Sequence, residues 1–173
     1  MPAMNLYDLR SLRVLVVDDN AHMRNLVMTI LHAFGVKQIE QASDGADALQ
    51  YMTTIDFDLI IADWMMEPLD GLDFTRLIRT GSDSRNPFVP IILMTGHTDL
   101  ESVIEARDAG VNEILAKPIS AKTLYDRIVS IIERPRPFIR TKTYAGPCRR
   151  RRKDPKYRGP ERRKADAETS VVA

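Results

Sequence analysis

The segment Leu59-Ile60-Ile61-Ala62-Asp63 is the most informative part of this chain, because four consecutive apolar residues end in an acid. A short, continuously apolar run is typical of a parallel strand that is buried on both faces of a sheet. Three other apolar runs also end in polar residues: 14–17 before Asp18 and Asp19, 91–94 before Thr95, and 114–116 before Lys117. Ligands of open α/β sheets bind at the carboxyl ends of the strands, so these polar residues are expected to share one edge.

Helical patterns alternate with the apolar runs. Gly35 and Asp70 are typical of a helix stop and a helix cap, and Thr98 and Glu101 have the spacing of a capping box. Helices are expected over residues 20–34, 43–52, 71–80, 98–109 and 120–133, and one further short strand is expected over 38–42. This alternation predicts an α/β fold of (βα)5 order: a doubly wound, five-stranded parallel sheet of flavodoxin-like type with helices on both faces.

The predicted edge of the sheet collects three carboxylates, one hydroxyl and one ammonium group. Asp18, Asp19 and Asp63 would repel one another, so together they favour a hard divalent cation such as Mg²⁺, which needs few protein ligands. Thr95 and Lys117 beside that cation would form a cradle for a phosphoryl group. Any one of these acids alone would be interpreted as a solvated loop residue, whereas the combination predicts a site for metal-assisted phosphoryl transfer.

Five motifs, in this order, resemble the response-regulator receiver domain of the chemotaxis-Y-like type. They are Val14-Leu15-Val16-Val17-Asp18-Asp19, Asp63 within Asp-Trp-Met-Met, Asp70-Gly71, Thr95-Gly96 and Lys117-Pro118. Each motif alone occurs by chance, but five motifs at their expected strand ends are specific. The resemblance covers about residues 11–133. It implies a signalling protein of a two-component phosphorelay that catalyses only its own phosphotransfer and autodephosphorylation.

The resemblance also implies a role for each matching residue. Asp63 would accept a phosphoryl group from the phosphohistidine of a sensor histidine kinase or of a histidine phosphotransfer protein. Thr95 would hydrogen-bond a phosphoryl oxygen, and Lys117 would pair with the phosphate. The Mg²⁺ ligands would be Asp18, Asp19, Asp63 and the backbone carbonyl of Met65. The peptide bond between Lys117 and Pro118 would be cis.

Two positions depart from the pattern of the family. The aromatic residue that often acts as a switch lies three residues before the lysine, and that position is Ile114 in this chain. An isoleucine has no ring to move between exposed and buried positions. Glu67 precedes Pro68 in the loop after Asp63, where it would either modulate the metal or remain a solvated loop acid.

The charge is divided unevenly along the chain. Residues 134–173 carry a net charge of +10, whereas residues 1–133 carry a net charge of −9. We therefore divide the chain into an N-terminal extension (1–10), a receiver domain (11–133) and a basic C-terminal tail rich in proline and arginine (134–173). The tail is expected to be mostly disordered. The alternatives are a basic arm for nucleic acid or a partner, and a segment that docks onto the acidic body.

Further features bear on the cellular compartment. Cys148 is the one cysteine, which fits a reducing cytosol. No apolar stretch approaches the ~18 residues of a membrane span, and residues 1–13 lack the apolar core of a signal peptide. The sequence therefore predicts a cytoplasmic protein, a monomer or weak dimer, without a membrane span.

Taken together, these features predict a stand-alone response regulator. It would signal through phosphorylation-dependent protein contacts on the surface formed by residues 99–109, 113–116 and 120–133; the sequence does not identify the downstream protein. The alternative is a nucleic-acid-binding regulator that acts through the basic tail. An independent phosphohydrolase is disfavoured, because Met65 occupies the position of the second aspartate in the Asp-x-Asp pattern of such enzymes.

Overall fold

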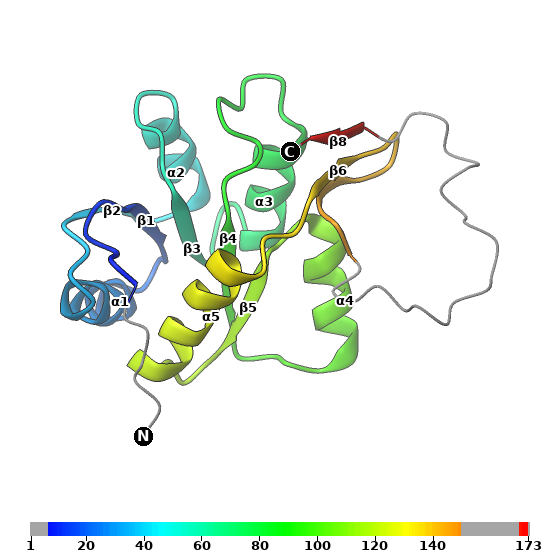
Figure 1. Cartoon of the computed structure of the whole chain (residues 1–173). Helices are drawn as coiled ribbons and strands as arrows, with labels where there is room; N and C mark the ends of the chain where they lie inside the picture. Colours follow the sequence, from blue (N-terminus) through cyan, green and yellow to red (C-terminus); the bar gives the residue numbers. More distant parts are fainter. Residues whose placement is uncertain (1–6, 150–169, 173) are drawn as a thin grey trace.

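The computed structural model describes residues 7–149 and 170–172 of the chain. Its centre is a parallel sheet with the strand order β2-β1-β3-β4-β5 (Figure 1). The strands are β1 Arg13–Val17, β2 Gln38–Ala42, β3 Leu59–Asp63, β4 Ile91–Thr95 and β5 Glu113–Ala116. The helices are α1 Ala21–Ala33, α2 Gly45–Met52, α3 Gly71–Thr80, α4 Leu100–Ala109 and α5 Ala121–Glu133. The predicted (βα)5 doubly wound fold is confirmed.

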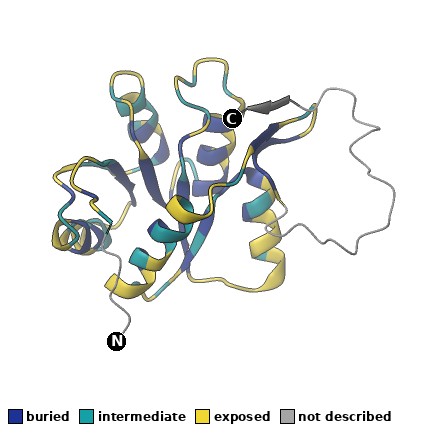
Figure 2. Cartoon of the chain, viewed as in Figure 1, coloured by how far each residue is buried: buried dark blue, intermediate teal, exposed yellow. Residues whose placement is uncertain are grey.

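Two apolar cores lie on opposite faces of the sheet, because successive residues of a strand point to opposite sides. Helices α2, α3 and α4 cover the face to which Leu15 and Ile60 point. Helices α1 and α5 cover the face to which Val16 and Ile61 point. The strands consequently form the buried centre of the molecule (Figure 2). Burial on both faces explains why β1, β3 and β4 are apolar without alternation, whereas the edge strand β2 is partly exposed and more polar.

Side-chain caps fix where the helices begin. Asp70 accepts a hydrogen bond from the amide of Asp73 at 2.7 Å, as its position predicted. The expected capping box of Thr98 and Glu101 is wrong, because α4 begins one residue later. Its cap is Asp99, whose two carboxylate oxygens accept from the amide and the hydroxyl of Ser102. Two charge-assisted hydrogen bonds to one carboxylate are stronger than the bonds that a threonine hydroxyl offers at this position.

Gly71 brings the first turn of α3 against the end of β3. Its amide donates to the carbonyl of Trp64 at 2.9 Å. A Cβ atom at position 71 would overlap the backbone carbonyl of Asp63 and approach the Leu93 side chain to 2.7 Å. The glycine of the Asp70-Gly71 motif therefore permits the close packing that holds the end of β3, where Asp63 lies.

The first part of the basic tail is ordered, which corrects the expectation of a mostly disordered tail for these residues. Strands β6 Phe138–Arg140 and β7 Ala145–Pro147 form an antiparallel hairpin, and β8 Ser170–Val172 pairs with the other side of β6. The hairpin lies beside α3 and α4 (Figure 1). Phe138, Ile139 and Tyr144 are at most 9 % exposed. Burial of these side chains removes apolar surface from water and so stabilises the hairpin. A purely charged arm would lack this stabilisation.

A buried arginine lies beneath the hairpin. The Arg79 side chain is fully buried, at 0 % exposure. Its guanidinium donates to the backbone carbonyls of Gly110, Pro87 and Val89 and to the side-chain carbonyl of Asn112, at 2.7–3.0 Å. The Phe138 ring covers it, with the guanidinium carbon 5.6 Å from the ring centroid. Burial lowers the pKa of Arg79 to about 9, so the side chain still carries its charge at neutral pH.

The Arg136 side chain and a close approach of two glycines hold the hairpin against the loop between α4 and β5. Arg136 donates to the carbonyls of Val111, Asn112 and Cys148. A Cβ atom at position 146 would lie 2.8 Å from the Cα atom of Gly110, so two glycines allow the backbones to approach closely. The hairpin is therefore held by specific contacts to the receiver domain as well as by burial.

The arginine run beyond the hairpin falls mainly on residues 150–169, which lie outside the described part of the chain. The predicted nucleic-acid contacts of the tail therefore stay predictions. Among the described residues, no helix is long and apolar enough to cross a membrane.

Candidate functional site

The carboxyl ends of β1 and β3 bring together the three predicted acids. Strands β1 and β3 are paired in parallel, with Val17 opposite Ala62, so the residues that follow lie side by side. Asp18, Asp19 and Asp63 each offer a carboxylate oxygen, and these oxygens lie within 4.8 Å of one another. Asp18 and Asp63 are buried and Asp19 is exposed. The cluster is thus open to solvent through one of its three members.

Asp18 has one carboxylate oxygen without a partner. Its Oδ1 accepts from the amide of Asn20 at 2.8 Å, whereas Oδ2 is buried and has no hydrogen-bond partner. Burial raises the pKa of Asp18 to about 6, and the nearby carboxylate of Asp63 adds to the rise. A buried, unsatisfied carboxylate oxygen is unfavourable, and a divalent cation bound among these acids would satisfy it. The donor set therefore fits Mg²⁺, which prefers carboxylate oxygens.

Lys117 reaches the cluster from the end of β5. Its Nζ lies 2.7 Å from Oδ1 of Asp63, and its backbone amide donates to the Thr95 carbonyl at 2.8 Å. The Lys117 side chain is 28 % exposed and that of Asp63 is 7 % exposed, so the ion pair is largely shielded from water. The peptide bond between Lys117 and Pro118 is cis, as the resemblance implied. The bond between Glu67 and Pro68 is also cis.

Thr95 ends β4 beside these residues. It is 2 % exposed, and its hydroxyl accepts from the amide of His97 at 2.9 Å and donates to the His97 carbonyl at 3.2 Å. The hydroxyl is therefore held by the following turn. Its predicted bond to a phosphoryl oxygen would require it to turn from the His97 carbonyl.

The loop after Asp63 holds the remaining predicted positions. The amide of Trp64 donates to the carbonyl of Met94 at 2.9 Å, which fixes the start of the loop. The Met65 side chain is 68 % exposed, and Glu67 is exposed as well. Metal binding by the Met65 carbonyl stays a prediction. Ile114 is half-buried and packs against the α2–α3–α4 side of the sheet.

Arg24 is a site residue that sequence reasoning missed. Its Nη1 donates to the backbone carbonyl of Asp18 at 2.6 Å, and its Nε donates to the Gln41 side chain at 3.2 Å. It thereby ties the loop after β1 to β2. The spacing from Asn20, which caps α1, places Arg24 one turn into the helix, and this spacing is the signal that would have pointed to it.

Sequence comparisons with known proteins identify the family to which the chain is similar. The model of the response regulator receiver domain matches residues 14–129. Chemotaxis protein CheY-3 of Vibrio cholerae is 34 % identical over 125 residues, which are 72 % of this chain and 95 % of that protein. Chemotaxis protein CheY of Pseudomonas aeruginosa is 33 % identical over 123 residues, which are 71 % of this chain and 98 % of that protein.

Solved structures of response regulators and receiver domains are also similar to this chain. The chemotaxis response regulator CheY4 of Vibrio cholerae superposes with a TM-score of 0.64 at 32 % identity, covering 69 % of this chain and 98 % of that one. The receiver domain of the Arabidopsis thaliana histidine kinase CKI1, complexed with Mg²⁺ and BeF3⁻, superposes with a TM-score of 0.60 at 33 % identity, covering 70 % of this chain and 92 % of that one.

A doubly wound sheet with an acidic cluster and a lysine at its carboxyl edge is the architecture of a receiver domain. The chain belongs to the response regulator receiver domain family. It is a response regulator of the two-component phosphorelay class, and members of this class are signalling proteins that bind Mg²⁺ at the acidic pocket.

Proposed function

We propose that Asp63 accepts a phosphoryl group from the phosphohistidine of a sensor histidine kinase or a histidine phosphotransfer protein. A carboxylate oxygen of Asp63 attacks phosphorus while the P–N bond breaks and the imidazole leaves. The observation that carries the proposal is the position of Asp63, buried between the ammonium of Lys117 and the unsatisfied carboxylate of Asp18. In-line transfer of this kind depends on positioning and on charge stabilisation rather than on covalent chemistry by the protein.

The acids of the cluster would hold Mg²⁺. The ligands would be Asp18, Asp19, Asp63 and the backbone carbonyl of Met65. When bound, Mg²⁺ supplies positive charge that offsets the negative charge of the carboxylates and of the incoming phosphoryl group. Asp19, the exposed member, keeps the cluster accessible to solvent.

Thr95 and Lys117 would recognise the phosphoryl group after transfer. The Lys117 ammonium already lies against Asp63, so a short movement takes it to a phosphoryl oxygen. The Thr95 hydroxyl exchanges its bond to the His97 carbonyl for one to the phosphoryl group. This exchange would transmit the state of Asp63 to the turn that precedes α4.

Signalling would use the surface of α4, β5 and α5, through contact with a downstream protein in the cytoplasm. Leu100, Val103 and Ile104 expose apolar surface there, with Leu100 75 % exposed. Exposed apolar groups that adjoin one another are typical of interaction surfaces. With Ile114 in place of an aromatic residue, the rotation of a ring contributes nothing to this switch.

The test of the proposed function is phosphorylation by acetyl phosphate with Mg²⁺. The Asp63→Asn variant is expected to lose phosphorylation completely, because an amide is a poor nucleophile. The exposed acid Asp56→Asn serves as the matched control and should be phosphorylated like the wild type. Intact-mass measurement detects the added phosphoryl group. A stable acyl phosphate on the Asp63→Asn variant would remove Asp63 from its proposed role.

A further inference from the structure

Asp18 is held by the fold at three of its four polar atoms. Its amide donates to the carbonyl of Ala42 at 3.2 Å, and its Oδ1 accepts from the amide of Asn20 at 2.8 Å. Its backbone carbonyl accepts from Nη1 of Arg24 at 2.6 Å. The fourth atom, Oδ2, is buried and has no hydrogen-bond partner. These contacts leave one oxygen of Asp18 for a cation and fix where that oxygen lies.

Arg24 is itself held by a second contact, on the edge strand of the sheet. Its Nε donates to Oε1 of Gln41 in β2 at 3.2 Å, while its Nη1 donates to the Asp18 carbonyl. The guanidinium is planar and rigid, so Nε and Nη1 keep a fixed position relative to each other. The two bonds together therefore determine where the backbone of Asp18 lies relative to β2.

Electrostatic attraction to the acidic cluster does not account for this arrangement. Arg24 forms no ion pair with a carboxylate of the described residues, and both of its acceptors are neutral oxygens. A positive charge next to a site for a divalent cation also repels that cation. The position of Arg24 is therefore explained by the backbone carbonyl that it holds.

We propose that Arg24 is a positioning residue that fixes Oδ2 of Asp18 and thereby makes the acidic cluster selective for Mg²⁺ over Ca²⁺. Mg²⁺ demands near-ideal octahedral geometry, whereas Ca²⁺ accepts a larger and more variable set of oxygen ligands at longer distances. A ligand that loses its fixed position consequently weakens Mg²⁺ binding more than Ca²⁺ binding. The inference rests on the proposed function, because it requires the acidic cluster to hold Mg²⁺.

The chain offers a matched control at the other end of the same strands. Arg13 donates from Nε to Oε1 of Gln38 in β2 at 3.0 Å and from Nη1 to the carbonyl of Asp56 at 3.5 Å. Arg13 thus contacts the same two kinds of group as Arg24, a glutamine of β2 and a backbone carbonyl. It lies at the amino end of β1, whereas the acidic cluster lies at the carboxyl end.

The experiment titrates the full chain with Mg²⁺ and, separately, with Ca²⁺. The fluorescence of Trp64, which follows Asp63, reports binding, and calorimetric titration gives the same affinities independently of the tryptophan. Arg24→Ala is expected to weaken Mg²⁺ binding about tenfold and Ca²⁺ binding only about twofold, because the residue orients a metal ligand. The preference for Mg²⁺ should then fall about fivefold. Arg13→Ala should leave both affinities unchanged.

The direction of the change separates positioning from charge. If Arg24 acted on the cation only through its charge, its removal would relieve repulsion, and both cations would bind more tightly. Arg24→Lys keeps the charge but cannot reach Gln41 and the Asp18 carbonyl through one rigid fork, so it should also lose selectivity. Gln41→Met leaves Arg24 in place without its Nε acceptor and should weaken Mg²⁺ binding about threefold.

Urea unfolding of each variant shows whether the titrated protein is folded. If Arg24→Ala does not fold, Arg24→Lys and Gln41→Met decide the question by the same change in selectivity. Three outcomes would overturn the inference: unchanged or tighter Mg²⁺ binding in the folded Arg24 variants, equal losses for Mg²⁺ and Ca²⁺, or the same loss in Arg13→Ala.

Failure of the proposed function would have a different signature. A wild type without a Mg²⁺ response would overturn the proposed metal site and the role of Arg24 together. A wild type that binds Mg²⁺ and is labelled on Asp63 by acetyl phosphate, with undiminished selectivity in the Arg24 variants, would contradict the role of Arg24 alone.

Discussion

Two of the buried charged residues in the described part of the chain, Asp18 and Arg79, differ in the hydrogen-bond partners that the fold gives them. At the carboxyl edge of the sheet, Asp18 is completely buried with one oxygen lacking a partner. At the opposite edge, Arg79 is equally buried, but four acceptors surround its guanidinium. Both side chains pay the cost of leaving water. The difference indicates that a buried charged group with an unsatisfied hydrogen-bonding atom marks a binding site. A buried charged group whose hydrogen bonds are all made within the protein instead stabilises the fold.

Replacing Arg79 tests the structural side of this comparison and has the largest expected effect. Arg79→Ala should lower the free energy of unfolding by about 3–5 kcal/mol, because it leaves a cavity and removes the donor from three backbone carbonyls. Arg76→Ala on the same helix is the control, since the Arg76 side chain is 47 % exposed and its ion pairs are worth about 0–1 kcal/mol. Urea unfolding gives both values. Equal losses in the two variants would mean that Arg79 is no more structural than a surface arginine.

The binding side of the comparison predicts a pH dependence at Asp18. Its pKa in the fold is about 6, above the ordinary value of 3.8, so the fold favours the protonated form. Ionisation of Asp18 therefore does not affect the free energy of unfolding below pH 4. As the pH rises through 6, the ionised carboxyl lowers the free energy of unfolding by about 3 kcal/mol. Without divalent cations, the wild type should lose that amount relative to Asp18→Asn between pH 4 and pH 7.

Chemical denaturation of the wild type and Asp18→Asn across this pH range measures the effect, and the difference cancels other titrating groups. Saturating Mg²⁺ should remove most of it, because the cation stabilises the ionised cluster. A stability difference that does not change with pH would show that Asp18 is ionised without cost.

Truncation tests whether the hairpin belongs to the fold. Removal of residues 134–173 should lower the free energy of unfolding by about 2 kcal/mol, since it exposes Arg79 and the surface under Phe138. Truncation after Arg149 keeps the β6–β7 hairpin and is the matched control. The two truncated proteins should differ in their amide chemical shifts around Gly110. The difference should be present at low salt and should persist at 1 M NaCl, where the Debye length is roughly 3 Å. Differences that vanish in high salt would mean that charge alone holds the tail.

The smallest expected effect concerns the exposed member of the acidic cluster. Trp64, the one tryptophan, follows Asp63 directly, so Mg²⁺ should change its fluorescence. Asp19→Ala should weaken Mg²⁺ binding about tenfold, because the number of charged ligands sets affinity at such sites. Asp73→Ala, an exposed acid on α3, is the control. Identical Mg²⁺ titrations of the wild type and Asp19→Ala would contradict a metal role for Asp19.

The strand ends were predictable from the sequence because each is a local signal. Apolar runs that stop at Asp18, Asp63, Thr95 and Lys117 define parallel strands, and parallel strands place their ends at one edge. The bounds of β3, α3 and β4 agree with those predicted. The predicted cap of α4, Thr98, lies one residue before the actual cap, Asp99, because threonine and aspartate are both good caps and only the geometry selects between them.

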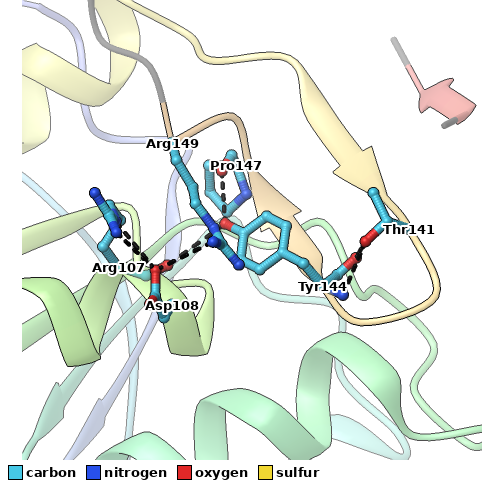
Figure 3. Close-up of polar contacts among 6 residues, drawn as sticks. All are labelled: Arg107, Asp108, Thr141, Tyr144, Pro147 and Arg149. Carbon is cyan, nitrogen blue, oxygen red and sulfur yellow. Dashed lines mark hydrogen bonds and ion pairs between the residues drawn. The ribbon is translucent and has the colours of Figure 1, made fainter. Parts of the chain in front are cut away.

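What the sequence by itself determined is the fold class, the order of its elements and the set of polar residues at the carboxyl edge. Local composition is sufficient for these, since periodicity and strand ends are short-range properties. What only the tertiary structure decided is the fate of charges whose partners lie far along the chain. Arg79 donates to Gly110 and Asn112, more than thirty residues away, and Arg149 pairs with Asp108, which is also distant in the sequence (Figure 3). In the sequence such arginines resemble solvated surface residues, because nothing local distinguishes a guanidinium that the fold will bury from one that it leaves in water.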